Sequence, residues 1–135
     1  MISPSLYDEA IECTWTLEQE LPLVWADRTN LMQVFLNLVT NSFRALSTVK
    51  DKNLSISTSN EGDRVVLEFM DSGGGIDHPE HLFHPFQDGA QATGLGLYLS
   101  RAFMRSFGGE LRYKALPWAA CFVVELSTVS PFEKT

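Results

Sequence analysis

The feature that most constrains this chain is a carboxylate and a glycine run at the end of a segment with the period of a β-strand. Between residues 64 and 70 apolar side chains alternate, so that Val65, Leu67 and Phe69 share one face, and Asp71 continues that face. A buried carboxylate without a partner is costly. A fold that keeps Asp71 on its core side is therefore expected to give it a partner. The glycines that follow let the backbone turn sharply and let a ligand approach closely.

A second pair of glycines, Gly94 and Gly96, opens the segment predicted to form the last helix, residues 95–107. The backbone N–H groups at a helix N-terminus are a natural site for anions. An acid at a strand end, a glycine turn and a glycine-led helix together predict a nucleotide pocket.

Charge and composition limit the partners of the chain. Its 135 residues carry a formal net charge of −7, which argues against a nucleic-acid partner and against polyanionic ligands in general. A phosphate site must then use local donors, a helix end or a metal ion. We expect neither a membrane span nor a signal peptide. Cys13 and Cys121 lie in strand-like runs and are predicted to be buried, reduced thiols.

The order of the predicted elements favours an α+β fold. A long helix at 28–49 with Asp27 as its N-cap, a turn of helix near 79–83 and the helix at 95–107 do not alternate regularly with strands. We expect a two-layer α/β sandwich, with a mixed, mostly antiparallel sheet of about five strands covered on one face by about three helices. Strands are predicted at residues 11–17, 54–58, 65–71, 110–114 and 121–126, the last two joined near Pro117 and Trp118.

The long helix carries a row of polar residues beside its apolar stripe. Asn37, Asn41, Arg44 and Thr48 recur at spacings of four, three and four and so lie along one edge. An asparagine carbonyl is an oxygen ligand that suits Mg²⁺, and an arginine one turn away can bind phosphate. A solvated polar face is the alternative interpretation of this helix taken alone.

Other ligand signatures are missing or incomplete. The chain contains no P-loop motif, no dinucleotide-binding glycine motif after a suitable strand, and no signature of the eukaryotic type of protein kinase. His78, His81 and His84 are evenly spaced, but Pro79 and Pro85 interrupt any regular geometry, which disfavours a zinc site.

Four motifs in order resemble the ATP-binding catalytic domain of sensor histidine kinases, which belongs to the gyrase, chaperone, histidine kinase and mismatch-repair superfamily with the Bergerat fold. Residues 31–42 resemble the N box, 71–76 the G1 box, 82–86 the F box and 93–97 the G2 box. The resemblance implies a domain at 11–128, a leader or linker from a preceding dimerisation domain at 1–10, and a tail at 129–135.

The resemblance also implies the cofactors and the site. ATP and Mg²⁺ would bind, with Asp71 accepting a hydrogen bond from the adenine amino group and Asn41 coordinating the metal. The implied catalytic group is Asn37, Asn41 and Arg44. The implied ATP-binding residues are Asn41, Arg44, Asp71, Gly73, Gly75, Ile76, Phe83, Phe86, Thr93, Gly94, Leu95, Gly96 and Leu97.

The implied reaction is transfer of the γ-phosphate of Mg-ATP to a histidine on a separate dimerisation domain, in a two-component signalling pathway. The hydrolysing relatives typically carry glutamate at the position of Asn37, and an amide cannot act as a general base, which favours transfer over hydrolysis. The implied partners are ATP, the histidine-bearing domain and a response regulator receiver domain, with a homodimeric parent and a cytoplasmic location of this domain. Membrane attachment of the parent stays open.

Two departures from the family pattern keep alternatives open. The segment 87–93 contains no Lys or Arg, and Ala92 replaces the first glycine of the G2 box. Arg101 is interpreted as a surface residue rather than as a substitute for the missing charge. The alternatives are a pseudo-kinase module of the same fold, which signals through protein contacts, and a superfamily ATPase or serine kinase.

Overall fold

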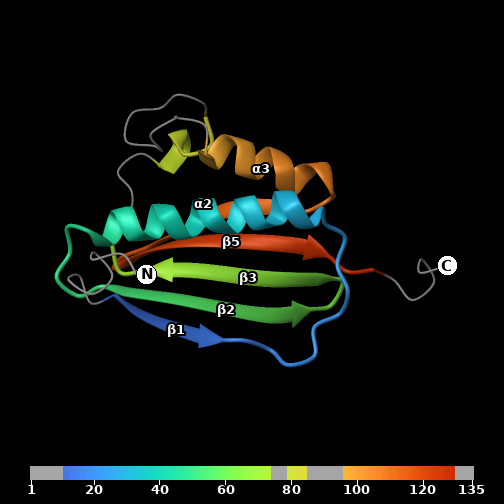
Figure 1. The fold of residues 1–135 in the computed structure, drawn as a ribbon, viewed down its shortest axis with the longest axis horizontal. Helices are drawn as coiled ribbons and strands as arrows, with labels where there is room; N and C mark the ends of the chain where they lie inside the picture. The colour runs from blue at the N-terminus through green and yellow to red at the C-terminus, as the bar shows by residue number, and fades with distance from the viewer. Residues whose placement is uncertain (1–10, 74–78, 85–95, 130–135) are drawn as a thin grey trace.

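The computed structural model describes residues 11–73, 79–84 and 96–129 (Figure 1). In chain order these form strand β1 (Glu12–Thr16), helix α2 (Arg28–Leu46), strands β2 (Asn53–Glu61) and β3 (Arg64–Asp71), the 3₁₀ turn η1 (Pro79–His81), helix α3 (Gly96–Ser106), and strands β4 (Glu110–Leu116) and β5 (Ala119–Ser127).

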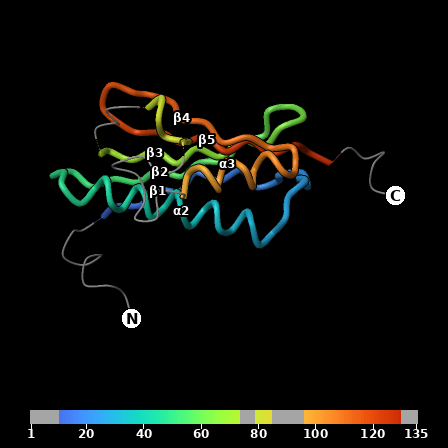
Figure 2. Tube along the Cα trace, turned by 90° about the horizontal axis from the view of Figure 1, so that it is seen from above, coloured from blue at the N-terminus to red at the C-terminus, as the bar shows by residue number. Residues whose placement is uncertain are grey.

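The five strands form one mixed sheet in the order β1-β2-β3-β5-β4. Strand β1 runs parallel to β2, and the other three pairings are antiparallel. Both α-helices lie on the same face of this sheet (Figure 2). The predicted α+β sandwich with five strands is therefore confirmed. No helix in the described part of the chain is long and apolar enough to cross a bilayer.

The described residues contain fewer α-helices than the expected count of about three. The described residues contain two α-helices, and the segment near 79–83 forms only the 3₁₀ turn η1. Two prolines, Pro79 and Pro85, stand six positions apart here, and the residue before a proline is disfavoured in the helical conformation. The interval is therefore too short for more than one tight turn.

Helix α2 starts as predicted and ends three residues early. The Asp27 side chain accepts a hydrogen bond from the Asn30 N–H at 2.9 Å, which confirms the N-cap. The helix ends at Leu46, because the Ser47 hydroxyl donates to the Arg44 carbonyl at 2.7 Å and the Lys52 ammonium donates to the Leu46 carbonyl at 2.9 Å. These side chains satisfy carbonyls that a longer helix would have paired.

The core lies between the two helices and the sheet. Three of the four residues predicted on the core face of β3, Val65, Phe69 and Asp71, are buried, and Leu67 is half-buried. Burial does not alternate strictly, because Val66 on the other face is buried as well. Fully buried residues of α2 and α3 complete the main cluster from the other side, namely Val34, Leu38, Leu46 and Met104. A smaller cluster of Val66, Cys121 and Val123 lies apart from this core.

The prediction that both cysteines are buried is half wrong. Cys121 is fully buried, but Cys13 is exposed. Cys13 belongs to β1, which is an edge strand whose residues are all exposed. The two-residue period of a strand predicts that its side chains alternate between the two faces of the sheet. It does not predict whether other elements cover those faces at that strand.

This difference gives a testable difference in thiol reactivity. Burial raises the pKa of Cys121 to about 11, so its thiol stays protonated as well as inaccessible at neutral pH. We expect iodoacetamide to alkylate one thiol of the native domain, Cys13, and to reach the second only after denaturation. Mass spectrometry of the alkylated peptides measures this. In a Cys13→Ser variant the native domain should remain unmodified, and rapid labelling of Cys121 there would contradict the burial described.

Candidate functional site

Asp71 is a buried carboxylate in an apolar setting. It is only 2% exposed, and its neighbours on the two adjacent strands are Leu54 and Ala120. Loss of hydration raises the pKa of Asp71 above its ordinary value, while the Gly73 N–H, which donates to Oδ1 at 2.9 Å, and the Ser42 hydroxyl partly offset this rise. The end of β3 therefore holds a destabilised charge of the kind found in binding sites.

Ser42 is the second polar group buried at this place. Its side chain is 1% exposed and lies close enough to Asp71 to lower the pKa of that carboxyl. The Ser42 hydroxyl nevertheless completes no hydrogen bond of ordinary geometry with the described residues. A buried hydroxyl beside a buried carboxylate fits a site for a polar ligand.

The sequence prediction did not include Ser42. One signal could have found it. Ser42 continues the apolar stripe of α2 in steps of four from Val34 and Leu38, so it is a hydroxyl at a core position. A polar residue at such a position needs a partner, and Asp71 is the polar group that faces it.

The turn after β3 is held tightly and leaves no room for a side chain at Gly73. A Cβ atom there would lie 2.7 Å from Asp71 Oδ1 and 2.9 Å from the Ala45 Cβ. The preceding residue anchors the turn, because Ser72 Oγ accepts from the Asn53 N–H at 2.9 Å and donates to the Asp51 carbonyl at 2.5 Å. The close approach of β3 to α2 thus requires glycine.

Asn37, on the polar edge of α2, contacts α3. The Asn37 amide donates to the Gly96 carbonyl at 3.3 Å and to Ser100 Oγ at 2.9 Å. Asn41, one turn further along, is half-buried and directly precedes Ser42. Arg44 is exposed and directly precedes Ala45, the residue that packs against Gly73. The amide row is therefore not simply a solvated face.

Phe83 and Leu97, which come from the F and G2 boxes, are packed rather than free. Leu97 is 4% exposed in the main core, and Phe83 packs against that core. The Arg101 guanidinium carbon lies 4.4 Å from the centre of the Phe83 ring, and Arg101 Nε is 3.2 Å from Glu110 Oε1. Arg101 thus joins the F box to the start of β4.

The remaining predicted site residues lie outside the described residues, namely Gly75, Ile76, Phe86, Thr93, Gly94 and Leu95. His78 lies outside them as well. His81 and His84 are exposed with ring centres 5.9 Å apart. Within the described ranges there is no group of three His, Cys, Asp or Glu side chains that could hold a metal ion.

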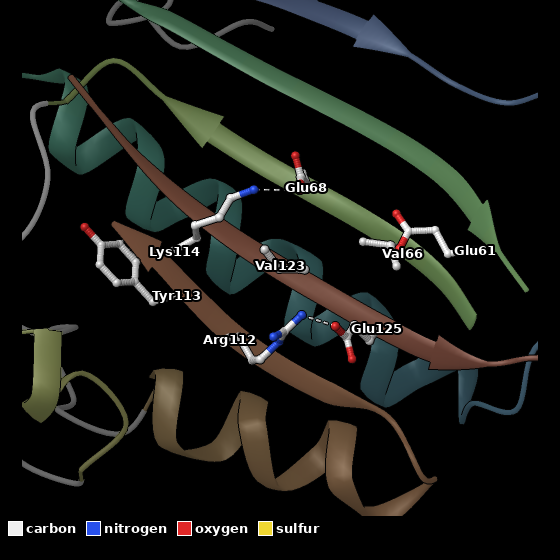
Figure 3. Close-up of a pocket in the computed structure, with 8 residues that line it drawn as sticks. All are labelled: Glu61, Val66, Glu68, Arg112, Tyr113, Lys114, Val123 and Glu125. Atoms are coloured by element: carbon white, nitrogen blue, oxygen red, sulfur yellow. Dashed lines mark hydrogen bonds and ion pairs between the residues drawn. The ribbon is translucent and has the colours of Figure 1, made fainter. Parts of the chain in front are cut away.

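A groove of about 260 Å³ lies elsewhere, across strands β3, β5 and β4 and the end of β2 (Figure 3). Four of the five charged side chains that line it are already paired, Lys114 with Glu68 at 3.2 Å and Arg112 with Glu125. It contains none of the predicted site residues. We therefore place the candidate site at the end of β3, under α2.

A buried acid at a strand end, a glycine turn against one helix, and an amide side chain that reaches a second helix are typical of an ATP-binding α+β domain. The chain belongs to the family of histidine kinase-, DNA gyrase B-, and HSP90-like ATPases, because the model of this family matches residues 26–129.

A curated relative agrees with this assignment. The sensor histidine kinase ZraS of Salmonella typhimurium is 30% identical over 135 residues, which cover 96% of this chain and 29% of ZraS. The chain therefore spans less than a third of the length of this curated relative.

Solved structures of two histidine kinases have the same fold. The nucleotide-free catalytic domain of ThkA has a TM-score of 0.80 and 26% identity, over 93% of this chain and 86% of that one. The structure of ThkA in complex with the response regulator protein TrrA has a TM-score of 0.75 and 26% identity, and the match covers 93% of this chain and 36% of ThkA. Full-length ShkA in complex with AMPPNP has a TM-score of 0.75 and 27% identity, and the match covers 95% of this chain and 28% of ShkA.

Proposed function

We propose that this chain is the ATP-binding catalytic domain of a sensor histidine kinase, which transfers the γ-phosphate of Mg-ATP to a histidine on a separate domain of its parent protein. The observation that carries the proposal is the buried Asp71 carboxylate beside the buried Ser42 hydroxyl at the end of β3. Such a pair costs free energy in the empty fold. A ligand that donates to the carboxylate and accepts from or donates to the hydroxyl would offset that cost, and adenine offers both kinds of group.

The other site residues take roles that follow from their chemistry. Asp71 accepts from the adenine amino group, and Gly73 keeps the backbone close to the base. Asn41 offers its amide oxygen to Mg²⁺, and Arg44 binds a phosphate. The metal, when bound, neutralises charge on the phosphates. The residues of 74–78 and 85–95 belong to the same proposal by motif alone, among them Gly75, Ile76, Phe86, Thr93, Gly94 and Leu95.

The chemistry of position 37 supports transfer over hydrolysis. Phosphoryl transfer depends on positioning and electrostatic stabilisation more than on covalent help from the protein. A neutral imidazole is already a nucleophile and needs no general base, whereas water does. Asn37 cannot act as a base, and both of its N–H groups donate to α3.

The partners in this proposal are a histidine-bearing dimerisation domain of the parent, a homodimeric parent and a response regulator receiver domain. The complex of ThkA with the response regulator TrrA supports the last of these. A cytoplasmic location is part of the same proposal, because ATP is the phosphoryl donor.

The test is calorimetric titration of the isolated domain with a non-hydrolysable ATP analogue and Mg²⁺. We expect binding, and we expect Asn41→Ala to weaken it by at least about tenfold, since even the outer partners of metal ligands contribute that much to affinity. The matched control is Thr40→Ala, because Thr40 is the adjacent residue and is exposed. With labelled ATP we expect negligible autophosphorylation, because no histidine of this chain lies in an acceptor context.

The same titration separates the two alternatives. No heat at millimolar nucleotide would favour a pseudo-kinase module, for which the absence of Lys and Arg from residues 87–93 is the motivating observation. Steady release of phosphate that is lost on substitution of Asn37 or Asn41 would favour a hydrolysing ATPase. Robust incorporation of label by the isolated domain would contradict a separate acceptor.

A further inference from the structure

The side-chain amide of Asn37 joins the two α-helices. Its Nδ2 group lies 3.3 Å from the Gly96 carbonyl and 2.9 Å from Ser100 Oγ, and its Oδ1 accepts from Gln33 at 3.3 Å. A backbone carbonyl can only accept, so the amide must present its nitrogen to α3. The two N–H groups of that nitrogen match the two acceptors, and the orientation of the side chain is thereby determined.

The contact falls on the first turn of α3. Gly96 is the first residue of the helix, and Ser100, one turn later, is fully buried. The first backbone N–H groups of an α-helix have no partner within the helix and face whatever lies beyond its N-terminus. The position of this turn relative to α2 thus sets where those N–H groups point.

Asn37 itself belongs to α2, the helix that also carries the other predicted phosphate-site residues. Asn37, Asn41 and Arg44 lie along one edge of α2, one turn apart. A displacement of α3 would change the distance between its N-terminus and that edge. Hydrogen bonds of fixed direction between the two helices restrict this distance more tightly than apolar packing alone, which has no directional preference.

We propose that Asn37 is a positioning residue, whose donated hydrogen bonds hold the N-terminus of α3 at the distance from α2 that a triphosphate requires. This inference rests on the proposed function. Asn37 then acts on ATP through α3, without itself touching the metal or the phosphates. Aspartate at position 37 could not make these two hydrogen bonds, because a carboxylate has no donor and would repel the Gly96 carbonyl.

The experiment compares Asn37→Asp with Ser100→Ala in titrations with the Mg-bound ATP analogue and with adenosine. Asn37→Asp keeps an oxygen that could bind a metal but loses both donors, and Ser100→Ala removes one acceptor from the other side. We expect Ser100→Ala, which removes one hydrogen bond, to weaken triphosphate binding about tenfold, and Asn37→Asp, which removes two, to weaken it by at least as much. Adenosine binding should weaken by less than about twofold in both variants. The double variant should be about as weak as the weaker single variant, because both changes break one link.

The matched control is Ser106→Ala, because Ser106 is an exposed serine at the other end of α3. It should change neither affinity. Triphosphate affinity that is retained in Asn37→Asp, together with no effect of Ser100→Ala, would overturn the inference in favour of a direct metal contact. Equal losses for adenosine and triphosphate would overturn it in favour of a purely structural role. Failure of the unmodified domain to bind either ligand would instead contradict the proposed function itself.

Discussion

Replacing Asp71 with asparagine is expected to weaken binding of Mg-ATP by about 1–3 kcal/mol, or roughly 5- to 150-fold in Kd. The Gly73 N–H takes one oxygen of the carboxylate at 2.9 Å. In the variant that N–H holds the amide oxygen, so the amide nitrogen turns toward the adenine amino group. Two donors then face each other in a buried place, where neither finds water. Calorimetric titration measures the loss.

The same substitution is expected to stabilise the nucleotide-free domain. Because burial raises the pKa of Asp71, the folded chain binds a proton more readily than the unfolded chain. The stability of the unmodified domain therefore falls as the pH rises from the ordinary value of 3.8 through the raised pKa, and the loss is complete above it. Asparagine carries no charge. The melting temperature of the Asp71→Asn variant should therefore exceed that of the unmodified domain at neutral pH. The difference between the two melting temperatures should become smaller toward acidic pH.

The control for Asp71 is Asp63→Asn. Asp63 is exposed in the turn that precedes β3, at the opposite end of the strand. It should alter neither nucleotide affinity nor the melting temperature. Unchanged affinity in Asp71→Asn would remove the adenine assignment, and a lower melting temperature would show that the carboxylate stabilises the empty fold.

Gly73→Ala is expected to abolish measurable nucleotide binding and to lower the free energy of unfolding by about 1–3 kcal/mol, the usual cost of overpacking. The new methyl would lie 2.7 Å from Asp71 Oδ1, 2.9 Å from the Ala45 Cβ and 3.2 Å from the Ala45 carbonyl oxygen. The carboxylate could rotate away, but the helix backbone could not. The end of β3 and α2 must therefore separate where the base would bind. Titration and urea denaturation measure the two effects.

Gly62→Ala separates the effect on the site from a general loss of stability. Gly62 has φ +75° with nothing within 4 Å of its Cβ position, so alanine there is strained but meets no neighbour. It should cost about 1 kcal/mol of stability and leave nucleotide affinity unchanged. If Gly73→Ala binds ATP normally, the turn after β3 is not part of the nucleotide site.

Much of the fold could be predicted because its signals are local. The strand β3, the Asp27 cap and the turn at Pro117 each depend on residues within a few positions of one another, and all three are confirmed. The boundaries were less accurate where distant residues decide them. Pairing with its neighbours extends β2 to Asn53–Glu61, and capping by Lys52 shortens α2. The buried Cys13 was predicted wrongly, because a strand period does not show that β1 is an exposed edge strand.

The sequence by itself determined the family and the placement of Asp71 on a core-facing strand end, because motif order and the two-residue period are carried by the chain alone. Only the tertiary structure decided what surrounds that carboxylate. Ser42 and Asp71 are 29 positions apart, and Asn37 and Ser100 are 63 apart, so no local pattern relates them. Packing of α2 on the sheet and of α3 beside α2 brings these pairs together. The free energy of a buried polar group depends on which polar groups lie next to it.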